Sequence, residues 1–255
     1  SFESGKVNAL LGKNGSGKST LVKCFSGAIQ PTSGAFYLDD QQLRFNTTAD
    51  ANAHGFATVY QEMSLIPSLS VAENIFLGRM PKKGSVIDWK KANEDASALL
   101  ARMGVDIDPR ETVSRLSMWQ CQVVEITKAM SYDPKVLMLD EPTSSLATSE
   151  VECLFNVIRE LKKQDIIIIY ISHKLHEVPQ ITDTITVLRD GEFIGKVDTK
   201  DVTNAEIIKM MFGDTQIRKR PDDVVPQDEV ILKVENLCRK NKFRNISFEL
   251  HKGEV

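Results

Sequence analysis

Eight consecutive residues near the start of the sequence have the composition of a phosphate-binding loop. They match the pattern G-x-x-x-x-G-K-[ST], in which glycines let backbone N–H groups curl around phosphates, the lysine reaches the β and γ phosphates, and the hydroxyl binds Mg²⁺. Average residue frequencies give an accidental match in about one percent of chains of this length. Because the motif also lies between an apolar run and a predicted helix, we expect it to bind phosphate groups. Its residues are Gly12, Lys13, Asn14, Gly15, Ser16, Gly17, Lys18 and Ser19.

A second group of polar residues follows the apolar run 136–139. Asp140 and Glu141 come directly after this run, an arrangement that holds the first carboxylate at the end of a strand, where it binds Mg²⁺ through water. The second carboxylate is then placed to orient or deprotonate a water that attacks a phosphate. Alone, an apolar strand ending in two acidic residues is usually only a strand entering a loop. Together with the phosphate loop, it predicts a site of phosphoryl transfer.

His173 and Gln61 are two further candidates, each following an apolar run. His173 comes after residues 166–171, so we expect it at the carboxyl end of a core strand, where open α/β sheets bind ligands. A lone histidine is more often structural, but its place after the acidic pair indicates a contact with the γ-phosphate. Gln61 follows residues 56–60, and a glutamine at a strand end is by itself a weak signal.

Short β-rich runs alternate with helical stretches, which predicts an α/β fold with a mostly parallel sheet flanked by helices. Between the second and third runs, residues 71–132 have helical periodicity and are interpreted as an inserted helical subdomain. Asp88 is expected to cap one of its helices, and Gly104 to end it. The expected strands are residues 7–11, 57–60, 135–139 and 166–171, and the expected apolar face of the capped helix is Trp89, Ala92, Ala96, Leu99, Leu100 and Met103.

The last part of the chain is predicted to hold a hairpin, a linker and the beginning of a repeat. Residues 185–187 and 193–197 flank an Asp-Gly pair, which favours a tight turn. Residues 213–228 are polar and contain prolines, as linkers do. Residues 246–249 and 252–255 then repeat the pattern of residues 1–3 and 5–7. We therefore expect a first domain over 1–212 and, over 229–255, the opening strands of a second copy in a longer tandem protein.

Composition excludes several other classes of protein. The chain has 255 residues, 42% hydrophobic and 26% charged, with a net charge of −3, so it is expected to be globular and not to bind nucleic acid. The longest strongly apolar run, residues 166–171, is far shorter than the roughly 20 residues that cross a bilayer. The cysteines form no C-x-x-C pair, which argues against zinc and disulfides and predicts buried thiols. They are Cys24, Cys121, Cys153 and Cys238.

Five motifs stand in the order found in ABC ATPases. These are the phosphate loop and residues 60–62, 116–120, 139–146 and 171–173, so that the chain resembles this family over residues 1–212, and again from about 229. Residues 124–129, 142–146 and 188–191 are similar to bacterial importers of ribose, galactose or xylose, whose ATPase subunit is two fused cassettes. The resemblance implies a P-loop NTPase fold with a RecA-like parallel-sheet core and an inserted α-helical subdomain.

The resemblance also implies an ATPase that uses ATP and Mg²⁺. Gln61 would be the Q-loop glutamine, His173 the switch histidine and Glu141 the catalytic carboxylate. Thr20 would join the phosphate loop and Asp140 in binding nucleotide, while Ser19, Gln61 and Asp140 would bind Mg²⁺, partly through water. The signature that faces the nucleotide of a partner cassette would be Leu116, Ser117, Met118, Trp119 and Gln120.

The implied partners are a second cassette, in the same full-length chain or a second copy, a transmembrane sugar permease and, indirectly, an extracytoplasmic sugar-binding protein. The implied place is the cytoplasmic face of the bacterial plasma membrane, as a peripheral subunit. A soluble ABC ATPase of translation or DNA repair shares the same five motifs and is an alternative. A cassette that binds ATP without hydrolysing it is another.

Three features depart from the family pattern. Met118 and Trp119 replace the signature glycines, and their bulk is expected to hinder the approach of backbone N–H groups to a phosphate. Ala147 stands where many ABC ATPases have an aspartate that crosses the dimer interface. The aromatic residue that stacks on adenine would precede Ser1, and Phe243 lies in the corresponding region of the next copy without an assigned role.

Overall fold

A computed structural model describes residues 1–213 and 227–254. The chain divides into two compact units, Ser1–Gly213 and Asp214–Val255. Most of the predicted linker, residues 214–226, lies outside the described residues.

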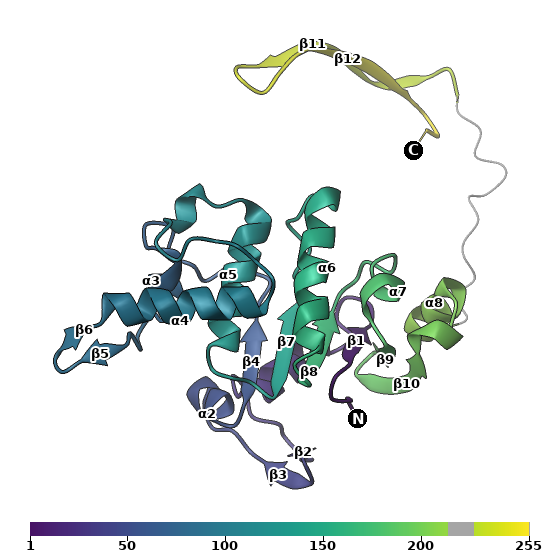
Figure 1. The fold of residues 1–255 in the computed structure, drawn as a ribbon. Helices are drawn as coiled ribbons and strands as arrows, with labels where there is room; N and C mark the ends of the chain where they lie inside the picture. The colour runs from purple at the N-terminus through teal and green to yellow at the C-terminus, as the bar shows by residue number, and fades with distance from the viewer. Residues whose placement is uncertain (214–226, 255) are drawn as a thin grey trace. The chain divides into compact units, whose positions relative to one another are not determined.

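A six-stranded sheet forms the centre of the first unit (Figure 1). Its strand order is β10-β9-β1-β8-β7-β4, and all neighbours are parallel except β9 and β10. The four strands expected from the sequence are confirmed, with ends that differ by at most one residue. The strands are β1 (Val7–Leu11), β4 (Phe56–Val59), β7 (Val136–Asp140), β8 (Ile167–Ile171), β9 (Thr184–Arg189) and β10 (Glu192–Asp198).

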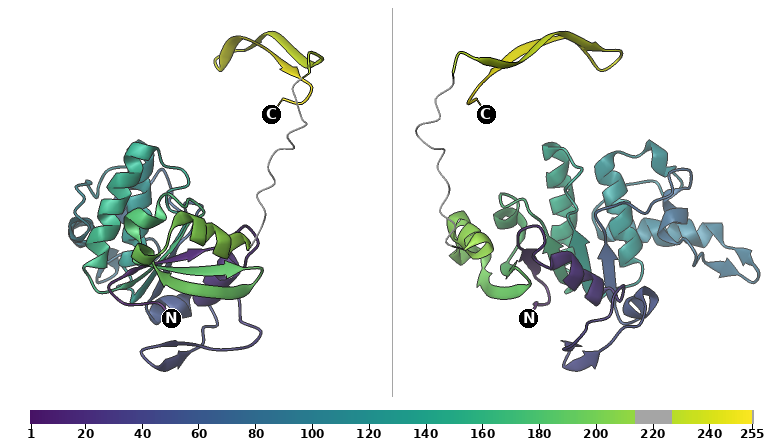
Figure 2. Two further views of the ribbon diagram at one scale, coloured as in Figure 1. Left: turned by 90° about the vertical axis from the view of Figure 1, so that its right-hand side faces the viewer. Right: turned by 180° about the vertical axis from the view of Figure 1, so that it is seen from behind.

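The central strands are apolar throughout because both faces of the sheet are covered. Successive side chains of a strand point to opposite faces, so Leu137 and Leu139 of β7 join the core with α6 (Thr148–Lys162). Val136 and Met138 join a second core with α1 (Lys18–Phe25). Figure 2 shows α1 and α6 on opposite sides of the sheet. A third core lies between β1, β9, α7 (Val178–Ile181) and α8 (Asn204–Phe212).

The predicted hairpin after the last core strand is confirmed. β9 and β10 pair antiparallel from Arg189 and Glu192 outward. The two residues between them, Asp190 and Gly191, have φ angles of 54° and 87°, as a two-residue turn matched to the strand twist requires.

The helical insertion contains α3 (Val71–Ile75), α4 (Trp89–Arg102), the 3₁₀ turn η1 (Val113–Arg115) and α5 (Met118–Met130). The Asp88 side chain accepts a hydrogen bond from the Lys91 N–H at 3.0 Å, and Gly104 follows the helix with a φ of 70°. Of the predicted face, Ala92, Ala96, Leu100 and Met103 are buried and Leu99 is partly buried. Trp89 is an exception, since it is 51% exposed at the first helical position, before the stripe that packs on the core begins.

The short elements were not predicted, because segments of two to six residues give no usable periodicity. They include α7 and also β2 (Phe36–Leu38), β3 (Gln41–Leu43), α2 (Thr48–Ala53), β5 (Lys82–Lys83), β6 (Val86–Ile87) and η2 (Thr199–Asp201). The expectation of four buried thiols is also wrong. All four cysteines are free, but Cys153 and Cys238 are exposed.

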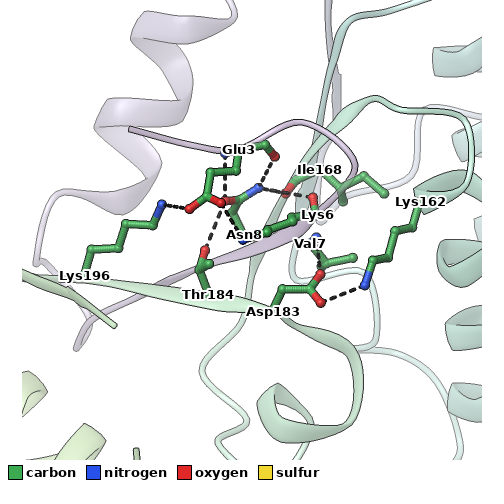
Figure 3. A network of polar contacts seen from close by, with 9 residues as sticks. All are labelled: Glu3, Lys6, Val7, Asn8, Lys162, Ile168, Asp183, Thr184 and Lys196. Carbon is green, nitrogen blue, oxygen red and sulfur yellow. Dashed lines mark hydrogen bonds and ion pairs between the residues drawn. The ribbon is translucent and has the colours of Figure 1, made fainter. Parts of the chain in front are cut away.

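A polar network fastens the amino ends of β1, β8 and β9 (Figure 3). Asn8, which is fully buried, donates to the carbonyl oxygens of Glu3 and Ile168 and accepts from the Thr184 hydroxyl at 3.0 Å. Asp183 accepts from the Val7 N–H at 2.8 Å and from Lys162 at 2.7 Å. These contacts satisfy buried polar groups at the end of the sheet opposite the candidate site.

The second unit is described as a hairpin of β11 (Val230–Arg239) and β12 (Phe243–His251). Residues 246–249 belong to β12, whereas residues 1–3, which they resemble in sequence, are not in a strand. Across the part of the chain that the structure describes, no helix is both long and apolar enough to span a membrane. The hairpin has exposed large apolar side chains: Val230, Ile231, Leu232, Leu237, Phe243, Ile246 and Phe248.

Candidate functional site

The carboxyl ends of four parallel strands bring the chemically distinctive residues to one edge of the sheet. β1 leads into residues 12–19, β4 ends two residues before Gln61, β7 ends at Asp140, and β8 ends two residues before His173. An open pocket of about 680 Å³ lies at this edge. Its lining residues are Gly12, Lys13, Asn14, Gln61, Glu141, His173, Leu175, Met211 and Phe212.

The phosphate loop has the backbone of an anion-binding turn. Gly15 and Gly17 have φ angles of 80° and 98°, which side chains with a Cβ rarely adopt. A Cβ on Gly12 would lie 2.3 Å from the carbonyl oxygen of Leu188, so this glycine is required by close packing against β9. Helix α1 then begins at Lys18 and directs its free N–H groups toward the loop.

The buried groups of the loop fit a bound anion. The Lys18 ammonium donates to the carbonyl oxygens of Gly12 at 2.7 Å and Lys13 at 3.1 Å. Burial lowers the pKa of Lys18, while the nearby Glu141 and Asp140 carboxylates act in the opposite direction. The Ser16 hydroxyl is buried and has no hydrogen-bond partner among the described residues. A phosphate group would restore charge balance and hydrogen bonds to these groups.

Asp140 and Glu141 have different environments although they are adjacent. Burial and then repulsion by Glu141 raise the pKa of Asp140, and Lys18 and Lys23 oppose this shift. Glu141 has a φ of 48°, an uncommon conformation for a residue with a side chain. Its N–H donates to the carbonyl oxygen of Ile171 at 2.9 Å, and its Oε1 lies 2.9 Å from Nδ1 of His173. The end of β8 therefore holds Glu141 directly beside His173.

Glu177 connects the loop that carries Glu141 with the loop that carries His173. It was not singled out from the sequence. Its carboxylate is 1% exposed and accepts hydrogen bonds from the hydroxyls of Tyr170 at 2.7 Å and Thr143 at 2.8 Å. Lys174, next to His173, donates to the carbonyl oxygen of Thr143 at 2.8 Å. One buried carboxylate thus positions the segments after both β7 and β8.

Other predicted residues lie around the pocket or away from it. Gln61 is exposed and lines the pocket, and Ser19 and Thr20 are exposed in the first turn of α1. The signature segment, residues 116–120, is not among the lining residues and forms the start of α5. Within it, the Gln120 side chain accepts from the Ser117 N–H at 2.9 Å.

The two bulky signature residues behave differently from each other. Trp119 is partly buried and packs against the core of the helical insertion, whereas Met118 is 45% exposed. Of this pair, only Met118 presents an exposed side chain at the start of α5.

The sequence did not predict two features of the site: the apolar side chains of α8 that line the pocket, and the contact of the β9–β10 turn with the phosphate loop. Met211 and Phe212 belong to α8, which reaches the site because it packs on β9, where Arg189 donates to the carbonyl oxygen of Met210 at 3.3 Å. The turn of the β9–β10 hairpin also touches the loop, since Lys13 lies 2.6 Å from Asp190. The Asp-Gly turn was visible in the sequence, but its contact with Lys13, 177 positions away from Asp190 along the chain, carries no local signal.

Comparison with known families decides what kind of fold holds this site. The family model described as ABC transporter matches residues 1–144. The chain belongs to the ABC transporter family. Its fold is that of an ABC ATP-binding cassette, with a P-loop NTPase core and an inserted helical subdomain.

Curated relatives of this cassette include sugar-import proteins. The galactose/methyl galactoside import ATP-binding protein MglA of Clostridium perfringens is 44% identical over 253 residues, which are 98% of this chain and 49% of the relative. The ribose import ATP-binding protein RbsA 1 of Streptomyces avermitilis is 42% identical over 251 residues, which are 98% of this chain and 48% of the relative. The chain thus spans about half the length of the curated relatives it matches.

Solved structures resemble the cassette as well. One is cbiO1 of Clostridium perfringens, described as part of the ABC transporter complex cbiONQ, with 28% identity and a TM-score of 0.69 over 82% of this chain and 83% of the other. A nucleotide-free ATP-binding cassette from an ABC transporter has 24% identity and a TM-score of 0.71 over 84% and 90%. The second likeness concerns the fold alone.

Proposed function

We propose that this chain is the first cassette of an ATPase that hydrolyses ATP to ADP and phosphate and thereby drives import of a monosaccharide through a membrane permease. The observation that carries the proposal is the pocket at the carboxyl edge of the sheet, where the phosphate loop, Glu141 and His173 meet. The sugar-import names of relatives at 42% and 44% identity supply the substrate class.

ATP would be held by the phosphate loop. The Lys18 ammonium would then donate its hydrogen bonds to phosphate oxygens instead of to the carbonyl oxygens of Gly12 and Lys13. Among the described residues, no group of three or more His, Cys, Asp or Glu side chains could hold a metal ion. Mg²⁺ would be bound here together with phosphate oxygens, as is usual for this ion, by Ser19, Gln61 and Asp140, with Asp140 reaching it through water. The bound ion would neutralise charge on the phosphates.

Hydrolysis would depend on Glu141 and His173. Glu141 would orient the attacking water and accept its proton, and His173 would hold Glu141 and contact the γ-phosphate. Their 2.9 Å contact and the hydrogen bonds to Glu177 support a preformed arrangement. Positioning and charge stabilisation, without covalent catalysis, would supply the rate.

The proposed full-length protein contains a second cassette, and each site combines one phosphate loop with the signature of the other cassette. Three observations support this: the relatives are about twice as long, residues 246–249 repeat residues 1–3 in sequence, and the β11–β12 hairpin exposes apolar side chains that a complete domain would cover. We place residues 1–212 in the first cassette, residues 213–228 in a linker and residues 229–255 in the opening strands of the second.

The proposed partners are a transmembrane sugar permease and, indirectly, an extracytoplasmic sugar-binding protein, with the ATPase peripheral at the cytoplasmic face of the plasma membrane. Co-purification of the complete protein with membranes that carry the permease would support this assignment. Co-purification with ribosomes or DNA would instead support a soluble ABC ATPase.

A second candidate function is a cassette that binds ATP without hydrolysing it. The exposed Met118 in place of a signature glycine favours this candidate for the site to which this signature contributes. Analysis of which of the two sites of the complete protein traps ADP under turnover would separate a hydrolysing from a silent site.

MgATP binding and steady-state ATPase activity test the main proposal. Lys18→Ala should remove most nucleotide affinity, because it removes the buried cation of the loop. Glu141→Gln should keep nucleotide affinity and reduce turnover by about 100-fold or more in the complete protein. Turnover equal to the parent's in Glu141→Gln would contradict the role of Glu141, and binding without dependence on Lys18 would contradict the site itself.

A further inference from the structure

The loop that follows Gln61 is attached to helix α5 by a buried carboxylate outside the pocket. Glu125, 8% exposed in the middle of α5, accepts hydrogen bonds from both the Ser64 N–H and the Ser64 hydroxyl. Lys128, one turn later on the same helix, donates to that hydroxyl at 2.8 Å. Ser64 is therefore held from its backbone and its side chain at once, three residues after Gln61.

A second buried polar side chain holds the same loop two residues further on. Asn74 of α3 is fully buried. Its Oδ1 accepts from the Ile66 N–H at 2.7 Å, and its Nδ2 donates to the Ile66 carbonyl oxygen at 3.1 Å and to that of Ser70 at 3.0 Å. The backbone N–H and the carbonyl oxygen of Ile66 are thus both hydrogen-bonded to the side-chain amide of Asn74, as they would be to the backbone of a neighbouring β-strand.

The loop is also joined by backbone hydrogen bonds to the segment that precedes the signature. The Ser114 N–H donates to the Pro67 carbonyl oxygen at 2.9 Å, and the Val113 N–H donates to that of Leu69 at 3.1 Å. Ser117 follows Ser114 by three residues and is the N-cap of α5. Gln61 and the signature, 56 positions apart in the sequence, are therefore linked through a short, hydrogen-bonded path.

We propose that Glu125 is a positioning residue that fixes the Gln61 loop to the signature helix, so that a change at Gln61 on nucleotide binding moves the start of α5 as one body with the loop. This inference rests on the proposed ATPase function and names residues that couple its pocket to its partner-facing segment. A buried, hydrogen-bonded carboxylate suits the role, because packed polar networks hold one arrangement instead of deforming gradually.

Turnover by the complete two-cassette protein tests the coupling through a double-mutant cycle. Glu125→Ala should leave the affinity for MgATP within about twofold, because Glu125 does not line the pocket, and should reduce kcat about tenfold or more through misplacement of Gln61. In a Gln61→Ala background, Glu125→Ala should change kcat by less than about twofold. Effects of Glu125→Ala that are equal in both backgrounds would overturn the inference.

Hydrogen exchange on the 255-residue chain gives a measurement that does not require turnover. In Glu125→Ala, the Ser64 amide should exchange at least about tenfold faster than in the parent, and Glu125→Gln, which keeps an acceptor oxygen, should restore most of the protection and of kcat. Unchanged protection at Ser64 would also overturn the inference. A parent protein without Lys18-dependent turnover would contradict the proposed function alone, since the exchange result still tests the anchor.

Thr127→Val is the matched control. Thr127 is fully buried in the same helix, but its hydroxyl donates to the Val123 carbonyl oxygen at 2.7 Å, within α5 and not to the loop. It should lower stability without changing kcat or the exchange of Ser64. Lys128→Met provides a second test variant that keeps the buried carboxylate, and a smaller increase in Ser64 exchange is expected from it. A kcat loss in Thr127→Val as large as that in Glu125→Ala would show a general effect of destabilising α5 and overturn the specific role of Glu125.

Discussion

At the scale of single residues, the site holds a carboxylate, Asp140, in a partly buried environment that disfavours its ionised form. The pKa of Asp140 is raised above its ordinary value of 3.8, first by burial and then by Glu141. An acid whose pKa is higher in the folded than in the unfolded chain costs stability, and this cost appears as the pH rises from about the ordinary value through the folded-state value. The nucleotide-free protein is therefore less stable at neutral pH than it would be with a neutral side chain at position 140.

Asp140→Asn should accordingly raise the melting temperature of the nucleotide-free protein at pH 7 while weakening Mg²⁺-dependent nucleotide binding. The gain should shrink as the pH falls toward the ordinary pKa of 3.8, because the carboxyl of the parent then becomes protonated in the folded and the unfolded chain alike. Thermal unfolding between about pH 4 and 8 measures this. Asp201→Asn, at an exposed position in η2, is the control, and a lower melting temperature for Asp140→Asn at pH 7 would contradict the sign.

Glu177 is a residue whose importance follows from burial and partners. Glu177→Ala would leave the hydroxyls of Tyr170 and Thr143 without their acceptor and Lys174 without a nearby carboxylate. Loss of a buried charged hydrogen-bond acceptor costs about 3 kcal/mol. Urea unfolding should show a loss of this size for Glu177→Ala and less than about 0.5 kcal/mol for the exposed Glu192→Gln. A loss below about 1 kcal/mol in Glu177→Ala would mean that water replaces the carboxylate.

Residue types in motifs could be predicted, whereas residues that position them could not. Lys18, Glu141 and His173 follow apolar runs at spacings that carry chemistry, and the structure brings them to one edge of the sheet. Glu125 stands in a helix and Glu177 in the turn before α7, positions where a glutamate is usually a solvated surface residue. Only the three-dimensional packing distinguishes a buried carboxylate from an exposed one.

At the scale of elements, the β9–β10 hairpin supports the phosphate loop from outside the motif. The Gly191 N–H donates to the Ser16 carbonyl oxygen at 3.3 Å, and Gly191 has a φ of 87°, so an alanine would strain the turn by roughly 1–2 kcal/mol. Gly191→Ala should lower the melting temperature and weaken MgATP affinity about three- to tenfold. Isothermal titration measures the affinity.

Gly84→Ala is the matched control for this prediction. Gly84 has a φ of 66° in the segment between β5 and β6, with nothing within 4 Å of an added Cβ. The variant carries a similar backbone strain far from the phosphate loop along the chain and should leave MgATP affinity unchanged. Equal losses of affinity in the two variants would show that the β9–β10 turn has no special connection with the loop.

The elements themselves divide by length into predictable and unpredictable ones. The runs that became β1, β4, β7 and β8 were recognisable because strands buried on both faces are continuously apolar. β2, β3 and α2 have too few residues for a period to emerge. Trp89 was assigned to the buried face by periodicity alone, which cannot show where along a helix the packing partner begins.

At the scale of the whole molecule, the residues that line the pocket all lie in the unit Ser1–Gly213. The last of them, Phe212, ends α8, and the three cores that hold the sheet edge also lie within this unit. Nucleotide binding should therefore be a property of the first unit. ATP turnover should not be a property of the first unit alone, because by our proposal it needs the signature of another cassette.

A chain of residues 1–213 should bind MgATP with an affinity within about twofold of that of the 255-residue chain, because no pocket residue is removed. Both should hydrolyse ATP at least about 100-fold more slowly than the complete two-cassette protein, since the missing signature would supply donors that stabilise charge on the γ-phosphate. Isothermal titration and steady-state phosphate release measure the two quantities, with Lys18→Ala as the control for site-specific binding. Loss of affinity in residues 1–213 would mean that the second unit contributes to the site. Lys18-dependent turnover by the 255-residue chain at the rate of the complete protein would mean that two copies of this cassette, with Met118 and Trp119 in their signatures, form a working pair.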